Sequence, residues 1–165
     1  MTELVRQLAA YAAYHRDRRN VATHMVGIPV IVLAMQVLTS RPMLDAGGWT
    51  VTTAVALSAA AALYYLRLDL GFGAAMAALM TLGCGLGAMI ASMPTAAWLA
   101  IGAGGFIGGW ALQFIGHHYE GRKPAFFDNL LGLLIGPLFI VADIAFALGL
   151  RRAVRTAVHH DPSAT

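Results

Sequence analysis

Apolar residues fill most of the chain in long runs, and the polar residues gather in short groups between them. Five runs are each near the length of about 20 residues that an α-helix needs to cross the hydrocarbon core of a bilayer. These runs cover residues 21–39, 49–66, 70–92, 94–115 and 129–150. The pattern predicts an all-α integral membrane protein with a bundle of four to five membrane segments. The first run is interrupted at Gly27-Ile28-Pro29 and the last at Gly136-Pro137, where helices kink or break.

A shorter, amphipathic pattern precedes the first run. An apolar stripe with steps of four, three and four residues predicts a helix over residues 2–16, and its members are Leu4, Leu8, Tyr11 and His15. On one straight helix, His15 and His24 would lie on opposite sides and about 13 Å apart along the axis. We therefore expect a turn at residues 17–20, with Asn20 as the N-cap of the next helix, so that the two histidines face each other.

A polar group ends the fourth run, and three of its members share one helical face. Gln113, His117 and Glu120 follow one another at steps of four and three. If the helix continues to Glu120, it carries an amide, an imidazole and a carboxylate on one stripe. His118 points about 100° away from His117 and is left out of the expected site. The loop that follows carries Arg122, Lys123 and Asp128.

Composition supports the assignment to a membrane. Hydrophobic residues make up 59% of the chain and charged residues 12%, with a mean hydropathy of +0.69, whereas a soluble domain carries about 25% charged residues. The basic residues flank the apolar runs and form no single stripe, so we expect no nucleic-acid partner. Cys84 is the one cysteine and has no disulfide partner within the chain. We expect one membrane domain over residues 1–155, a polar C-terminal tail over residues 156–165, and no cleaved signal peptide.

The basic residues also predict an orientation. With the N-terminus in the cytoplasm and every run spanning, seven basic residues up to Lys123 lie inside and Arg41 lies outside. The tail, with Arg151, Arg152 and Arg155, would also lie outside, which the positive-inside rule disfavours. A re-entrant fifth segment returns the tail to the cytoplasm, and we favour four spans plus one such segment. Either topology places the polar groups on the cytoplasmic side: His15, His24, His117, Glu120 and Asp128.

These polar groups indicate a metal site. Non-haem iron oxygenases commonly bind Fe(II) through two histidines and one carboxylate. Here His15, His24 and His117 would supply nitrogen ligands, and Asp128 or Glu120 would act as a further ligand or a neighbour. A histidine ligand usually donates its other N–H to an acceptor, a role that suits three polar neighbours, namely Gln113, Glu120 and Asn20. The alternative is a set of interfacial histidines that water and lipid headgroups satisfy.

One further acid lies inside the last apolar run. Asp143 is a functional candidate because ionisable groups are costly at membrane depth. A hydrogen bond to a carbonyl freed near Pro137 is the simpler account of it. A small transporter would need paired charges near mid-membrane, and Asp143 stands alone there.

Two blocks of the sequence resemble a known family. The first is YHRDRRNVATHMVGIP, Tyr14 to Pro29, and the second is WALQFIGHHYEGRKPAFFDNLLGLLIGPLFIVADI, Trp110 to Ile144. In their order and spacing they are similar to the membrane-bound 2-hydroxy fatty acid dioxygenase family, whose fungal members act in the breakdown of phytosphingosine to odd-numbered fatty acids. The family pattern of Tyr-His, Asn-x3-His and Gly-His followed by an acid falls on His15, Asn20, His24, His117 and Glu120.

The resemblance implies an enzyme of lipid metabolism in a bacterial-type inner membrane. Its cofactor would be ferrous iron, Fe(2+), and it would carry out the α-oxidation of a long-chain 2-hydroxy fatty acid with O2, giving CO2 and the acid one carbon shorter. Arg122 or Lys123 would pair with the substrate carboxylate. The alternative function is a non-catalytic lipid-binding or scaffold membrane protein. The sequence leaves the oligomeric state open, an oligomer included.

Overall fold

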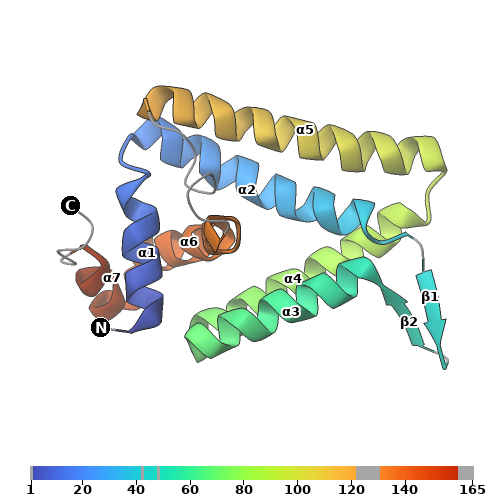
Figure 1. The fold of residues 1–165 in the computed structure, drawn as a ribbon, viewed down its shortest axis with the longest axis horizontal. Helices are drawn as coiled ribbons and strands as arrows, with labels where there is room; N and C mark the ends of the chain where they lie inside the picture. Colours follow the sequence, from blue (N-terminus) through green and yellow to red (C-terminus); the bar gives the residue numbers. More distant parts are fainter. Residues whose placement is uncertain (1, 42, 48, 122–130, 160–165) are drawn as a thin grey trace. The chain divides into compact units, whose positions relative to one another are not determined.

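The structure is a computed structural model that describes residues 2–41, 43–47, 49–121 and 131–159. These residues form seven helices and one two-stranded β-hairpin (Figure 1). The elements are α1 (Glu3–Ala13), α2 (Arg18–Leu38), β1 (Met43–Ala46), β2 (Trp49–Thr52), α3 (Thr53–Leu68), α4 (Leu70–Ala91), α5 (Thr95–Glu120), α6 (Leu131–Ala147) and α7 (Arg152–His159). The prediction of an all-α membrane protein is confirmed, with the hairpin as an addition.

The chain divides into two compact units. The first unit is Met1–Val26 with Leu112–Thr165, and it holds α1, the start of α2, the end of α5, α6 and α7. The second unit is Gly27–Ala111, and it holds the rest of α2 and α5 together with β1, β2, α3 and α4. The residues of the expected site that the structure describes all belong to the first unit.

Three helices among the described residues are long and apolar enough to cross a membrane, namely α2, α4 and α5. A fourth span arises only if α6 and α7 are counted as one, and these two helices meet at a bend of 116°. The outward faces of α4 and α5 are apolar, with Leu82 of α4 61% exposed and Ile107 of α5 68% exposed. Such side chains would be costly in water and suit contact with lipid.

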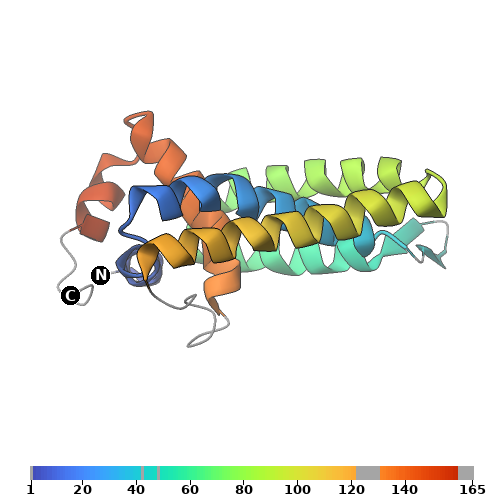
Figure 2. The ribbon, with the colours of Figure 1, turned by 90° about the horizontal axis from the view of Figure 1, so that it is seen from above.

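A tight antiparallel hairpin joins α3 and α4 in the second unit, with Asp69 alone between the two helices (Figures 1 and 2). Asp69 ends α3 and caps α4, because its carboxylate accepts a hydrogen bond from the backbone N–H of Phe72 at 2.9 Å. Gly73 lies against the backbone of Tyr65 and Leu66, where a Cβ atom would overlap. The two helices can therefore pack at close range.

Glycines also bring α4 and α5 close to α2 within the second unit. Gly83 of α4 packs against Gln36 of α2, and Gly87 packs against Gln36 and against Ser40, which follows α2. Gly109 of α5 packs against Gly27 and Ile31 of α2. Small residues at such spacing are typical of close contact between membrane helices. Gly104, by contrast, has open space where a Cβ atom would stand, and so does Gly108.

One helix boundary differs from the sequence expectation, and neither proline ends its helix. The second apolar run was expected to begin at residue 49, but residues 49–52 pair with β1, and α3 begins at Thr53 behind the N-cap Thr52. The aromatic and β-branched residues at positions 49–52 favour a strand over a helix there, and Gly47 before them has a φ of 66°. The helices α2 and α6 run through Pro29 and Pro137 without ending, because a proline removes only one bond of the helical ladder and long apolar helices tolerate it.

Candidate metal centre

The first ligand candidate, His15, is held by the C-terminal end of α1. Its ring stacks on Tyr11 with centroids 4.1 Å apart and planes 12° apart, and Tyr11 in turn packs against Phe139 of α6 at 5.0 Å. The Nδ1 atom of His15 lies 2.8 Å from the carbonyl oxygen of Tyr11. A carbonyl oxygen can only accept, so Nδ1 carries the proton and Nε2 presents a lone pair.

A turn at residues 14–17 brings the second candidate, His24, beside the first. The α2 helix begins at Arg18, and the Asp17 carboxylate accepts a hydrogen bond from the N–H of Arg19 at 2.8 Å. The expected N-cap at Asn20 is therefore wrong, because Asp17 caps the helix earlier and Asn20 already lies in its first turn. The rings of His15 and His24 have centroids 4.6 Å apart, so the prediction that a break lets them face each other is confirmed.

The third candidate, His117, comes from the far end of the chain. The α5 helix continues to Glu120, as the stripe requires, and Gln113 and His117 are both buried on it. One ligand atom from each of His15, His24 and His117 lies within 4.8 Å of the other two, and each residue is at most 6% exposed. Among the described histidine, cysteine and acidic residues, these three form the group that is close enough to hold a metal ion.

The arrangement of nitrogen atoms fits one ion. Three nitrogens at about 2.1 Å from a single ion lie about 3.0 to 3.4 Å apart from one another. The Nε2 atoms of His24 and His117 are 3.2 Å apart. The Nδ1 atom of His24 lies 2.9 Å from the carbonyl oxygen of Asn20, which again leaves Nε2 as the atom with the lone pair. Two of the three rings are thus set to bind a metal through Nε2.

Several buried polar atoms around the three rings have no hydrogen-bond partner in the described part of the chain. They are His15 Nε2, Asn20 Oδ1, Gln113 Nε2 and His117 Nδ1. Buried polar atoms in native proteins are nearly always paired, and an unpaired one calls for a missing water, ion or ligand. Four such atoms around one trio of imidazoles match a site for a metal ion and a polar ligand.

Burial favours the neutral form of the His15 imidazole. Its pKa is lowered from the usual value because the buried ring loses the hydration that stabilises the charged form, and this effect outweighs the hydrogen bond to the Tyr11 carbonyl, which raises the pKa. A neutral imidazole is the form that binds a metal ion. The nearby Asp17 has a lowered pKa because Arg19 donates hydrogen bonds to its carboxylate.

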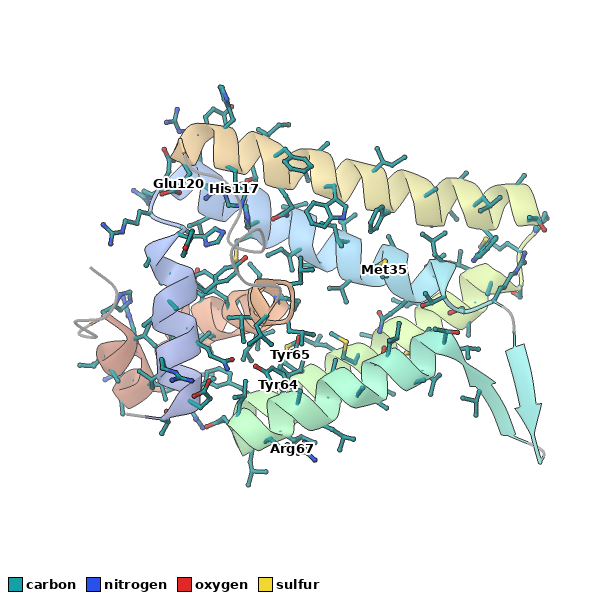
Figure 3. All side chains as sticks on the ribbon, viewed as in Figure 1. Met35, Tyr64, Tyr65, Arg67, His117 and Glu120 are labelled. Carbon is teal, nitrogen blue, oxygen red and sulfur yellow. The ribbon has the colours of Figure 1, made fainter. Side chains whose placement is uncertain are left out.

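Glu120 binds the turn between α1 and α2. Its carboxylate accepts hydrogen bonds from the backbone N–H groups of Arg16 at 3.0 Å and Asp17 at 2.9 Å, and from the side-chain amide of Asn20 at 2.9 Å. Figure 3 shows Glu120 and His117 together at the C-terminal end of α5. One carboxylate therefore connects the element that carries His117 to the turn between the other two histidines.

Gly116 is a part of the site that the sequence reasoning missed. A Cβ atom on Gly116 would overlap the Thr23 hydroxyl and the Asn20 side-chain oxygen of α2. The absence of a side chain lets α5 approach α2 directly beside His117 and His24. The Gly-His pair of the family pattern was the available signal, but it gives no reason for the glycine without the contact.

The structure does not assign the remaining expected residues to this cluster. Arg122, Lys123 and Asp128 lie outside the described residues. His118 is exposed on α5, in agreement with its exclusion. The side chain of Asp143 makes no hydrogen bond in the described part of the chain, so the bond to a carbonyl near Pro137 is not found there.

Comparison with known proteins bears on the same residues. The family described as 2-hydroxy-palmitic acid dioxygenase Mpo1-like matches residues 1–148, which include both polar groups. The chain belongs to the Mpo1-like family. This Mpo1-like chain is also similar to the 2-hydroxy-palmitic acid dioxygenase MPO1 of Saccharomyces cerevisiae, at 28% identity over 163 residues, which cover 98% of this chain and 90% of the yeast protein. No solved structure matches it.

Proposed function

We propose that this Mpo1-like protein is an Fe(II)-dependent dioxygenase that shortens a long-chain 2-hydroxy fatty acid by one carbon. The observation that carries the proposal is the buried trio of His15, His24 and His117 in a family named for a dioxygenase. The Nε2 atom of His15 is unpaired, and those of His24 and His117 lie 3.2 Å apart. A membrane protein can take such an acid directly from the bilayer, where the carboxylate lies at the headgroup level.

The proposed reaction balances without a further reductant. The 2-hydroxy acid R–CH(OH)–COOH and O2 give R–COOH, CO2 and H2O. The bond between C1 and C2 breaks, C1 leaves as CO2, and C2 becomes the carboxyl carbon of the shorter acid. The substrate supplies all four electrons that reduce O2, so the reaction needs no 2-oxoglutarate.

The donor set suits both the metal and an acidic substrate. Bound iron would supply the redox chemistry with O2 that zinc lacks. Three neutral imidazoles do not compensate the charge of a divalent ion, so the site keeps a net positive charge. That charge favours a carboxylate, and Arg122 and Lys123 of the following loop are proposed to pair with it as well. Asp128 is proposed as a further metal ligand.

The neighbouring polar residues are proposed to position these groups. Glu120 would hold the α1–α2 turn, and with it His15, at the correct distance from His117. Asn20 would connect Glu120 to α2 through its amide and keep its side-chain oxygen for the site. Gln113, one helical turn before His117, would donate its unpaired amide N–H to a substrate oxygen.

The orientation is also part of the proposal. Because α1 and α7 pack against each other in the first unit, the basic residues near both ends of the chain would lie on the same side of the membrane. The positive-inside rule then favours the cytoplasmic face of a bacterial-type inner membrane for that side and for the metal site.

Metal analysis separates the proposal from the alternative of a lipid-binding scaffold. Protein purified without oxygen and supplied with Fe(II) should hold about one iron per chain, the number that one trio of histidine ligands implies. Removing the metal with a chelator should stop turnover, and Fe(II) should restore it where Zn(II) does not. Protein that retains no metal after this treatment would favour the scaffold.

A further inference from the structure

The end of α6 is built as a sharp turn and does not continue as a longer span. Gly149 and Arg151 both have left-handed backbone conformations, with φ of 76° and 53°. The N–H of Leu150 donates to the carbonyl of Ala145 at 2.8 Å, which closes the last turn of α6. The chain then starts α7 at 116° to α6.

Large apolar side chains are exposed at this turn beside arginines. Leu148 is 71% exposed and Leu150 is 56% exposed. They lie next to the first residues of α7, and the described residues 144–159 contain no acidic side chain. A soluble surface would rarely expose two leucines beside a cluster of basic residues. This combination is typical of a segment at the boundary between headgroups and acyl chains.

The α7 helix has two distinct faces. Val158 is buried and Val154 is half-buried, and the two lie on one face of the helix. The helix α7 packs on α1 (Figures 1 and 2). Arg152 and Arg155 are exposed and lie well around the helix from that face. Arg152 donates only its Nε–H, to the carbonyl of Gly149 at 3.2 Å, and neither arginine forms an ion pair in the described part of the chain.

We propose that α7 lies along the membrane surface and binds anionic lipid headgroups. Arg152 and Arg155 contact the lipid phosphates, and Leu148 and Leu150 enter the acyl boundary below them. Basic amphipathic helices bind such surfaces by apolar burial together with attraction to anionic lipid. The apolar residues of α6 end at this turn, so a membrane-embedded α6 would place the start of α7 at the membrane surface.

The contact with α1 gives this docking a structural consequence. The α1 helix carries Tyr11 and ends at His15, and α7 packs against α1 within the same unit. The acidic residue of α1, Glu3, is already bonded to Arg6 and Gln7, so it does not neutralise the arginines of α7. Anionic lipid would therefore hold α7, and through it α1, at the headgroup level.

The test measures amide hydrogen exchange of α7 in the full-length protein in lipid nanodiscs. One set of discs contains phosphatidylcholine alone, and the other contains phosphatidylcholine with one-third phosphatidylglycerol. Exchange at residues 152–159 should be about fivefold slower or more in the anionic discs, because docked arginines oppose local opening of the helix. High salt should remove the difference, since it screens exposed charges.

Matched variants assign the effect to the two arginines. The double variant Arg152→Gln/Arg155→Gln should lose the dependence on anionic lipid, and Arg152→Lys/Arg155→Lys should retain it. Arg67→Gln, which removes an exposed arginine at the α3–α4 connection, should leave the lipid dependence intact. Equal exchange of wild-type α7 in the two kinds of disc overturns the proposal, and so does a lipid dependence that survives in the double glutamine variant.

Discussion

The Nε2 atoms of His24 and His117 lie 3.2 Å apart, although 93 positions separate the two residues in the chain. Both rings are buried, and the carbonyl of Asn20 leaves the His24 atom without a proton. Two imidazole nitrogens at that distance can share one proton or one metal ion. With His15 beside them, the shared ion is the more complete explanation, because it also engages the open Nε2 atom of His15.

Removing any one of the three histidines should abolish iron binding. His15→Ala, His24→Ala and His117→Ala each delete one of three ligands, and the remaining pair cannot hold the ion at the same affinity. Elemental analysis of protein loaded anaerobically with Fe(II) measures the effect. His118→Ala is the matched control, because His118 is exposed on the same helix, and it should keep full occupancy. Normal iron content in His24→Ala would contradict the assignment.

Glu120→Gln should weaken iron binding by about 10- to 100-fold, the usual effect of changing a residue that supports a metal ligand. The substitution removes the negative charge that accepts hydrogen bonds from the backbone N–H groups of Arg16 and Asp17. Exchange of those two amides should accelerate in the same variant, even in metal-free protein. Glu3→Gln, at an exposed acid of α1, is the control. If iron binding weakened while both amides stayed protected, Glu120 would act on the metal directly and not through the turn.

Gly116→Ala should destabilise the protein by about 1–3 kcal/mol, the range for overpacking a well-packed site. The added methyl group overlaps Thr23 and Asn20 of α2, so α5 must move away from α2 and His117 away from His24. Gly104→Ala on the same helix is the control, because open space surrounds that position. Thermal unfolding of the two variants in the same detergent checks the difference, and equal midpoints would show that close approach at Gly116 is unimportant.

Iron occupancy should fall in acid. The pKa of His15 is lowered by burial, so the neutral imidazole persists below the pKa of about 6.5 of a free histidine. Protons and metal compete for the same nitrogen atom, and binding is therefore complete near neutral pH and lost only on the acid side of that value. Equilibrium iron content measured across a pH series tests the sign. Loss of iron on raising the pH from acid to neutral would be the opposite of the expected behaviour.

The faces of the helices could be predicted from sequence, but the contacts between distant segments could not. The 3.6-residue period places Gln113, His117 and Glu120 on one stripe, and the structure keeps all three on one helix. The need for a break between His15 and His24 follows from the same geometry. The position of this break was predicted wrongly because Asn20 and Asp17 are both good N-caps. Only the structure shows that the Asp17 carboxylate accepts a hydrogen bond from the backbone N–H of Arg19.

The partners of Glu120 were beyond sequence reasoning for a different reason. Two of them are backbone N–H groups, which every residue except proline carries, so no side-chain pattern identifies them. The contact of Gly116 with α2 likewise depends on a residue that is 96 positions away at Asn20, by the difference of their numbers. The short hairpin of residues 43–52 was absorbed into an apolar run because its strands are too short to alter the hydropathy pattern.

The most direct test of the central claim is the identity of the product. Iron-loaded protein in a bilayer receives a long-chain 2-hydroxy fatty acid and O2, without 2-oxoglutarate, and the lipid products are analysed by mass spectrometry. The account predicts the acid one carbon shorter, a far poorer reaction with the acid that lacks the 2-hydroxyl, and no product from His24→Ala. An iron-loaded wild-type sample that gives no shortened acid from any of several chain lengths, with both stereoisomers supplied, would contradict it.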